Sequence, residues 1–255
     1  MENLVADHCW QLERCNQRGG RMLSVFDLIE ARTLDLDLAS YLMARISRGA
    51  SFLVGAVPGG AGKTTVMCAL LNLVPADVIL LPATPENVRN GGKASPDCGR
   101  SCYVCHEIGR GSYFAYLWGE DLRRFCLLAD ERHILATNLH ADTMAQAREQ
   151  ICLDNGVSAA SFHRFHLLVF LAIEGGSWRG RRRVSAVYES DGAGPHGLLW
   201  ATGRTPSFDF SVSAPWMEDP YCRACREFLR AGIDAGIRTI EQTRERVLAF
   251  LREQG

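Results

Sequence analysis

The chain has 255 residues, of which 47% are hydrophobic and 22% charged, an ordinary globular composition that suits one large domain or two small ones. Its 28 lysines and arginines nearly balance its 29 aspartates and glutamates, which disfavours broad nucleic-acid binding, so no nucleic-acid partner is expected. The longest apolar run, Leu167 to Ile173, is far shorter than the roughly 20 residues that span a bilayer, and no signal peptide is recognisable, so we expect a cytoplasmic protein.

In chain order, residues 1–23 are polar and predict an irregular leader, and the apolar spacing between residues 24 and 48 predicts two helices. The next expected elements are a buried strand at residues 51–57, a glycine-rich turn, a helix at 63–73, a strand at 77–81, a loop at 84–101, a strand at 102–106, a helix at 113–128, a strand at 133–138 and a helix at 142–153.

The last third of the chain predicts strands at residues 165–173 and 183–189 around a turn, a further strand at 198–201, and helices at 222–231 and 237–252. The pattern indicates an α/β fold with a mostly parallel sheet flanked by helices, an antiparallel hairpin extension and C-terminal helices. We expect a core at residues 24–204 and a helical segment at 205–255. A basic cluster at the hairpin is interpreted as a solvated turn: Arg179, Arg181, Arg182 and Arg183.

The segment VPGGAGKTT predicts a phosphate-binding loop, because glycines let backbone N–H groups converge on phosphate oxygens just before a helix begins. Lys63 is expected to reach the β- and γ-phosphates of ATP, and Thr64 to hold Mg²⁺ through its hydroxyl. Val57 stands where the pattern has its first glycine, and a glycine-rich turn without a ligand is the alternative. The expected nucleotide-binding residues are Pro58, Gly59, Gly60, Ala61, Gly62, Lys63, Thr64 and Thr65.

Glu107 is the candidate acidic residue, since it follows the short strand that ends at His106. A carboxylate at a strand end near Mg²⁺ can order the water of the metal or polarise the attacking water. The alternative is an ordinary strand-end glutamate.

Several segments together resemble the ATPases of type II and type IV secretion and pilus assembly, the superfamily of GspE, PilT and VirB11. The resemblance covers roughly residues 25–190. It begins in the segment that leads into the loop and includes VPGGAGKTT as the Walker A loop. It continues with CYVCHEIGRG as the Walker B strand, HILATNLHADTMAQAREQI as the His box and LLVFLAIEGGSWRGRRRVSAVYES as the closing hairpin.

The resemblance implies a RecA-like P-loop core in which Glu107 is the Walker B acid, followed by Arg110, and His140 approaches the γ-phosphate. Lys63, Glu107 and His140 are then the catalytic set. For His140 the alternative is a strand-end histidine that caps the next helix. The resemblance also implies a homo-oligomer, a hexamer in the family, and a membrane-associated secretion or pilus platform as partner, which would hold the protein at the inner face of the membrane.

Two departures from the family favour an alternative function. The acidic box expected after the second strand is replaced by a stretch in which Glu86 has a shifted register, and only about 50 residues precede the loop. We therefore expect a short form without the N-terminal domain of the family. The leading hypothesis is a motor-type ATPase, and the alternative is a nucleotide-dependent switch with weak hydrolysis. A small-molecule kinase is a third reading, for which no arginine-rich lid segment is found.

Ten cysteines allow a zinc hypothesis, in which four thiolates bind one ion. Cys102 and Cys105 cannot both be ligands, because residues three apart on a strand face opposite sides. The alternative is that the cysteines are small buried hydrophobes, and no disulfides are expected. The candidate ligands are Cys98, Cys102, Cys222 and Cys225.

Overall fold

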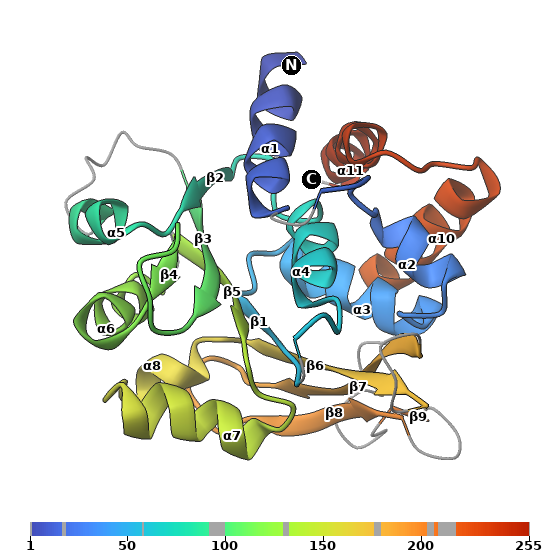
Figure 1. The fold of residues 1–255 in the computed structure, drawn as a ribbon. Coiled ribbons are helices and arrows are strands. Elements are labelled where there is room, and N and C mark those ends of the chain that lie inside the picture. The colour runs from blue at the N-terminus through green and yellow to red at the C-terminus, as the bar shows by residue number, and fades with distance from the viewer. Residues whose placement is uncertain are drawn as a thin grey trace.

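The computed structural model describes residues 2–16, 19–57, 59–91, 100–129, 133–175, 180–202, 207–208 and 218–254. Two residues predicted from the sequence to belong to sites, Pro58 of the phosphate loop and Cys98 of the zinc set, lie outside these ranges. The described elements form three layers, with one central sheet between two groups of helices (Figure 1).

The described strands form one mixed sheet in the order β2-β3-β5-β1-β6-β7-β8-β9, with β4 paired to β3. Strands from β2 to β6 pair in parallel, and β6, β7, β8 and β9 pair antiparallel. The expected parallel sheet with an antiparallel extension is confirmed. The strand bounds are β1 Phe52–Gly55, β2 Ile79–Pro82, β3 Ser101–Ile108, β4 Tyr116–Leu117, β5 His133–Leu139, β6 Leu167–Glu174, β7 Arg181–Glu189, β8 Gly197–Ala201 and β9 Ser207–Phe208.

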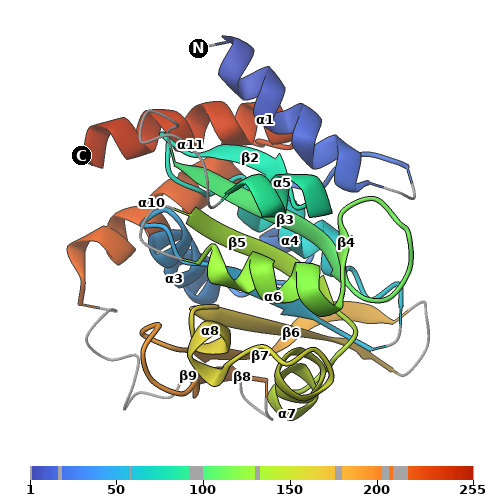
Figure 2. The ribbon, with the colours of Figure 1, turned by 90° about the vertical axis from the view of Figure 1, so that its left-hand side faces the viewer.

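Helices cover both faces of the sheet (Figure 2). One face carries α1, α2, α3, α4, α10 and α11, and the other carries α5, α6, α7 and α8 with the π-helical segment η1. The bounds are α1 Glu2–Cys15, α2 Val25–Glu30, α3 Leu36–Ile46, α4 Lys63–Leu71, α5 Pro85–Gly91, α6 Gly119–Leu127, α7 Met144–Arg148, η1 Glu149–Asp154, α8 Ala159–His163, α10 Pro220–Asp234 and α11 Ile240–Gln254.

Side chains alternate along the central strands between two hydrophobic cores. In β1, Phe52 and Val54 belong to the core under α4, while Leu53 belongs to the core under α6 and α8. Cys102 and Cys105 of β3 likewise fall in different cores, so the expectation that they face opposite sides is confirmed. Continuous burial of both faces explains the nearly unbroken apolar runs of these strands.

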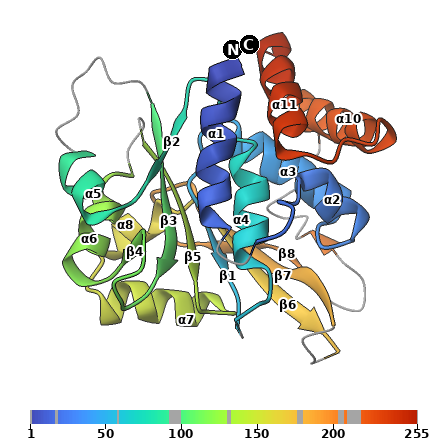
Figure 3. The same ribbon diagram turned by 45° about the horizontal axis from the view of Figure 1, so that its top comes forward.

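The expectation of an irregular leader is wrong, because its first part is the helix α1. Val5, Cys9, Leu12 and Cys15 are buried along one side of α1, at the spacing of a helical stripe. Figure 3 shows α1 lying beside α4 and α11, and α1 packs on both of them. The N-terminal segment is thus part of the helical layer that covers the phosphate-loop side of the sheet.

Three local expectations are corrected by the structure. The first half of the expected loop at 84–101 is helix α5, whose first turn is capped by the hydroxyl of Thr84 accepting from N–H of Asn87 at 3.2 Å. The helix expected at 113–128 begins only at Gly119, after the short strand β4. The helix expected at 142–153 changes to π-helix at Glu149. Among the described helices, none combines the length and apolar character that a bilayer crossing requires.

Arg244 of α11 ties the C-terminal helices to the end of α4. Its buried guanidinium donates to the carbonyl oxygens of Asn72, Val74 and Pro75 at 3.1, 2.7 and 3.1 Å. These carbonyls lie just beyond the last residue of α4, where a helix leaves its C=O groups without intrahelical partners. Arg244 therefore closes the end of the helix that is opposite to the phosphate loop.

Candidate functional site

The glycine-rich loop connects β1 to α4 as the sequence predicts. Gly60 and Gly62 have φ of 91° and 95°, a conformation that favours glycine. Gly55, at the end of β1, has a different reason to be glycine, because a Cβ there would lie 2.5 Å from the carbonyl oxygen of Ala141. Val57 is not among the described residues with positive φ, so its side chain costs the turn no backbone strain.

The N-terminus of α4 presents backbone N–H groups to the loop. Gly62 is the N-cap, and no side chain among the described residues caps this end. The N–H group of Val66 is the first to bond inside the helix, to the carbonyl oxygen of Gly62 at 2.9 Å. A helix start with uncapped N–H groups and the positive end of its dipole attracts an anion such as phosphate.

Three polar side chains meet beside this helix start. Nζ of Lys63 lies 3.7 Å from Oε1 of Glu107 and 3.4 Å from Nδ1 of His140. Nε2 of His140 lies 3.6 Å from the same Glu107 oxygen. The residues come from α4, β3 and the turn after β5, so the predicted catalytic set, separated by up to 77 residues in the sequence, is brought together.

Burial and charge set the protonation tendencies of this group. Burial raises the pKa of Glu107, and the nearby Lys63 ammonium opposes that rise. Burial, helped by the Lys63 charge, lowers the pKa of His140, so a neutral imidazole is favoured at neutral pH. Oε1 of Glu107 is buried and has no hydrogen-bond partner among the described residues, which leaves an acceptor available for a ligand or a water molecule.

A β-bulge directs Glu107 toward α4. The pairing of β3 with β5 shifts register between Cys105 and Ile108, so Glu107 lies in the irregular part of the strand. Such bulges re-aim side chains next to functional sites. The side chain of Glu107 is 9% exposed, which is unlike an ordinary solvated glutamate at a strand end. This burial beside a cation favours the functional interpretation of Glu107 over its alternative.

His140 does not cap the helix that follows it. The N-cap of α7 is Thr143, whose hydroxyl accepts from N–H of Gln146 at 3.2 Å. The imidazole of His140 instead lies over the phosphate loop, where its Cε1 would be 3.7 Å from a Cβ at Gly59. The capping alternative therefore does not describe this side chain.

A cavity of about 500 Å³ opens in front of this group. Its lining includes every described residue of the predicted loop from Gly59 to Thr65, together with Lys63, Glu107 and His140. The lining also includes residues from the N-terminal part of the chain, among them the apolar residues Met22, Leu23 and Leu28. Sequence reasoning missed this part of the lining, because residues 1–23 were expected to be irregular. The helical spacing of Val5, Cys9 and Leu12 was the signal that could have revealed it.

Arg182, which the sequence pattern assigned only to the basic cluster of the hairpin, also lines the cavity. Its Nε donates to the carbonyl oxygen of Gly60 at 3.1 Å, and its side chain crosses Gly62. Arg182 is exposed on β7, as expected for a solvated hairpin, but it also contacts the loop, whereas Arg183 pairs with Glu174. Arg179 lies outside the described residues.

Two residues suggested by the resemblance lie away from this group. Glu86, considered as a substitute for the acidic box, is exposed in the first turn of α5 and does not line the cavity. Arg110 places its guanidinium carbon 5.0 Å from the ring centre of Trp118 and does not line the cavity either. Among the described lining residues, Glu107 is the one carboxylate.

The zinc hypothesis finds no support in the described residues. They contain no group of three or more His, Cys, Asp or Glu side chains that could hold a metal ion, and Cys98 lies outside them. Cys102, Cys222 and Cys225 are all buried within one hydrophobic core. They fit the alternative interpretation, in which they serve as small apolar side chains.

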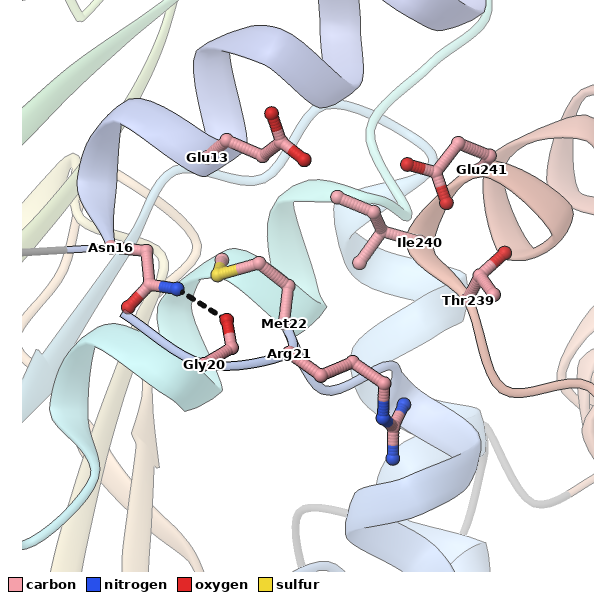
Figure 4. Close-up of a pocket in the computed structure, with 8 residues that line it drawn as sticks. All are labelled: Glu13, Asn16, Gly20, Arg21, Met22, Thr239, Ile240 and Glu241. Carbon is pink, nitrogen blue, oxygen red and sulfur yellow. Dashed lines mark hydrogen bonds between the residues drawn. The ribbon is translucent and has the colours of Figure 1, made fainter. Parts of the chain in front are cut away.

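A smaller cavity of about 340 Å³ lies between the end of α1 and the start of α11 (Figure 4). The amide of Asn16 donates to the carbonyl oxygen of Gly20 at 2.9 Å across one side of it. Arg21 donates to Asp27 and to the carbonyl oxygen of Arg238 at 2.9 and 2.7 Å. These bonds fix the connecting segment whose residues Arg21 and Met22 line both cavities.

No protein-family model matches the sequence, and no curated protein matches it. Among solved structures, the fold is similar to the VirB11 ATPase of the Brucella suis type IV secretion system, solved in complex with sulphate. The identity is 19% and the TM-score 0.44, over 64% of this chain and 53% of that chain. It is also similar to the Legionella pneumophila ATPase DotB, with 12% identity and a TM-score of 0.38, over 88% of this chain and 57% of that chain. The chain spans less than two thirds of the length of either structure. Both of these proteins are ATPases.

Proposed function

We propose that the protein binds ATP with Mg²⁺ in the 500 Å³ cavity and hydrolyses it with a RecA-like P-loop core. The convergence of Lys63, Glu107 and His140 on the uncapped N-terminus of α4 is the observation that carries this proposal. Positive groups gather at this end of the cavity, as a triphosphate requires. The apolar lining at Met22, Leu23 and Leu28 suits a nucleotide base.

The roles follow from the position of each group. The N–H groups of Gly62 to Thr65 and the Lys63 ammonium would bind phosphate oxygens, and Arg182 would bring a further positive charge to the loop. Glu107 would accept a hydrogen bond from the attacking water and orient it. Neutral His140 would donate a hydrogen bond to the γ-phosphate.

The residues fit a phosphate-bound magnesium ion. Thr64 is partly buried at the start of α4, and Oε1 of Glu107, which lies 3.7 Å from the Lys63 ammonium, would accept a hydrogen bond from a water of the ion. When bound, the ion would neutralise charge on the phosphates. Oxygen atoms from a threonine and a carboxylate are the donors that magnesium prefers.

The experiment that tests the site is ATP binding by the Lys63→Ala variant. Binding of a fluorescent ATP analogue is measured by anisotropy in the presence of Mg²⁺. The matched control is Arg246→Ala, which removes one positive charge at an exposed position on α11. We expect Lys63→Ala to lose binding and the control to keep it. Unchanged affinity in Lys63→Ala would show that the assignment is wrong.

The alternative function is a nucleotide-dependent switch that hydrolyses ATP poorly. It is favoured by the single carboxylate in the described cavity lining, Glu107, which is already engaged with Lys63. Phosphate release under saturating ATP separates the two functions. Turnover that exceeds the background and depends on Glu107 supports the ATPase, whereas tight binding with background turnover supports the switch.

A motor function would add an assembly and a partner. We propose a homo-oligomer, with a hexamer as the form implied by the family, acting at the inner face of the membrane on a secretion or pilus platform. Light scattering during gel filtration, with and without ATP and Mg²⁺, tests the assembly. A nucleotide-dependent hexamer supports the motor, and a monomer under both conditions supports the switch.

A further inference from the structure

Cys15 is the last residue of α1 and lines the 500 Å³ cavity, as does His106 near the end of β3. Its Sγ lies 3.2 Å from Nε2 of His106, and both residues line the cavity. Only 3% of the surface of Cys15 is exposed. A small molecule inside the cavity would therefore lie beside this thiol, even though little of the thiol is exposed at the protein surface.

The contact between Cys15 and His106 can exist in two protonation forms. In one form the thiol donates to Nε2, and in the other the Nε2–H group donates to a thiolate, so the two forms differ by the transfer of one proton. The backbone carbonyl of His106 accepts from the amide of Asn138 at 2.9 Å, and Phe114 packs against the imidazole edge to face. These contacts hold the imidazole toward the sulfur. Nδ1 of His106 is buried and has no hydrogen-bond partner among the described residues.

The thiol of Cys15 donates to the carbonyl oxygen of Gln11 at 3.5 Å, whereas the ionisable groups that face it favour its thiolate. Cys68 of α4, His106 and Cys102 of β3, and Arg14 of α1 surround it. The hydrogen bond from the Cys68 thiol lowers the pKa of Cys15, burial opposes this, and His106 and Arg14 lower it further. The contact with Cys15 and burial raise the pKa of Cys68, whose thiol donates to the carbonyl oxygen of Leu12 at 3.9 Å.

We propose that Cys15 is a nucleophilic thiolate and that this wall of the cavity is a covalent modification site for small, soft electrophiles. In the reaction with iodoacetamide, the sulfur of Cys15 forms a bond to the methylene carbon and iodide leaves with the electron pair of the broken carbon–iodine bond. No oxidant or reductant takes part. The group that is added then occupies the cavity.

The test is the pH dependence of iodoacetamide labelling, read at each cysteine by peptide mass spectrometry. Cys152 is the internal reference, because it is more exposed than Cys15 and burial raises its pKa. An ordinary thiol with a pKa of about 8.5 gains roughly tenfold in labelling rate per pH unit up to that value. We expect the Cys15 rate to level off about one pH unit or more below that value, while the Cys152 rate keeps rising.

The shape of the profile does not depend on how easily the reagent reaches each thiol. A Cys15 rate that rises in parallel with that of Cys152 would overturn the proposal, and so would a Cys15 that stays unlabelled while Cys152 reacts. A lower plateau rate at Cys15 agrees with the proposal, since intrinsic nucleophilicity falls as the pKa of a thiol falls.

Two variants test the partners of the thiolate. His106→Gln keeps a polar side chain but removes the imidazole, and Cys68→Ala removes the neighbouring thiol on α4. Each is expected to raise the midpoint of the Cys15 profile by about one pH unit. An unchanged Cys152 profile in the same sample shows that the variant is folded. If both folded variants keep the wild-type Cys15 profile, the assigned partners are wrong and the proposal fails.

A further arm of the experiment rests on the proposed function. With ATP and Mg²⁺ present, labelling of Cys15 is expected to slow at least several-fold, because the nucleotide fills the same cavity. A shifted Cys15 profile without protection by ATP would support the thiolate and contradict the proposed position of the nucleotide. A normal profile together with protection would contradict the thiolate and support that position.

Discussion

The Nζ atom of Lys63 lies 3.7 Å from Oε1 of Glu107, and only 8% and 9% of these two side chains are exposed. Two opposite charges are thus held together in a place with little solvent. Each lowers the cost of burying the other, because an unpaired buried charge is strongly unfavourable. The same two groups are the proposed phosphate ligand and the proposed water-orienting carboxylate.

Removing the ammonium is expected to destabilise the fold in a pH-dependent way. In Lys63→Met, Glu107 loses its cation and its pKa, already raised by burial, rises further. The folded state then binds a proton more readily than the unfolded state. The variant is therefore most stable at acidic pH. It loses stability as the pH rises from the pKa of Glu107 in the unfolded chain through the higher pKa of Glu107 in the folded state. Urea unfolding should show a loss of roughly 3 kcal/mol at neutral pH and less at about pH 5.

The double variant Lys63→Met with Glu107→Gln is the control for this effect. It removes the carboxylate as well, so its stability should recover and become nearly independent of pH in the same range. ATP binding should stay lost. Equal pH dependence in the single and double variants would show that Glu107 is not the responsible group.

Glu107→Gln alone should separate binding from hydrolysis. The amide keeps the size of the side chain but cannot take a proton, so ATP affinity is expected to change by less than about threefold. Loss of a general base lowers a rate by roughly 10²- to 10⁴-fold. Phosphate release under saturating ATP measures this loss. Wild-type turnover in the variant would assign water activation to another group.

His140 should make a small contribution to stability that disappears in acid. Burial and the Lys63 charge lower its pKa, so the unfolded state takes up the proton first as the pH falls. Wild type should therefore lose stability relative to His140→Gln as the pH falls from about 6.5 through the folded pKa. The difference should be constant above about pH 7.5. Thermal unfolding of both proteins across this range is the measurement, and a constant difference throughout would contradict the lowered pKa.

Arg182→Gln should weaken ATP binding, whereas Arg181→Gln should not. Both arginines are exposed, but Arg182 lines the cavity and donates to the carbonyl oxygen of Gly60, whereas Arg181 does not line the cavity. A hydrogen bond to a charged group contributes about 1.5–3 kcal/mol, which corresponds to roughly ten- to a hundredfold in affinity. Anisotropy titration of the two variants compares equal losses of charge on adjacent residues. Equal weakening in both would indicate a general electrostatic effect.

Arg244→Met should destabilise the fold without changing the chemistry of the cavity. It leaves the three carbonyls beyond α4 without their buried donor, which costs about 3 kcal/mol. Arg246→Met, on the exposed side of the same helix, should have an effect below about 0.5 kcal/mol. Urea unfolding gives both values. A similar small effect for the two variants would show that the bonds of Arg244 contribute little.

The phosphate loop and the central strands were predictable because their signals are local. Glycines at fixed spacing need particular φ values, and strands buried on both faces are continuous apolar runs, as in Phe52–Gly55. The order of the glycine-rich loop, Glu107 and His140 then indicated which strand ends meet. The carboxyl ends of parallel neighbours lie at one edge of a sheet, so the proximity of these residues could be expected before their contacts were known.

The remaining parts depend on tertiary contacts that the sequence does not show. Half of the residues of α1 are polar, and its buried side is recognised only when α4 and α11 are present to cover it. Arg182 and Arg183 are adjacent in a basic run, yet the alternation of β7 sends one to the phosphate loop and the other to Glu174. Ala115 has φ of 54° just before β4, a strained turn that has no signature in its residue type.

The two ends of α4 are attached to different parts of the molecule. Its first turn lines the cavity, and hydrogen bonds from Arg244 to three carbonyl oxygens connect its far end to α11. A helix of 9 residues is a stiff rod about 14 Å long. A displacement of its first turn along the helix axis would therefore strain those hydrogen bonds or move α11 with it. The C-terminal helices are thus connected to the loop through α4.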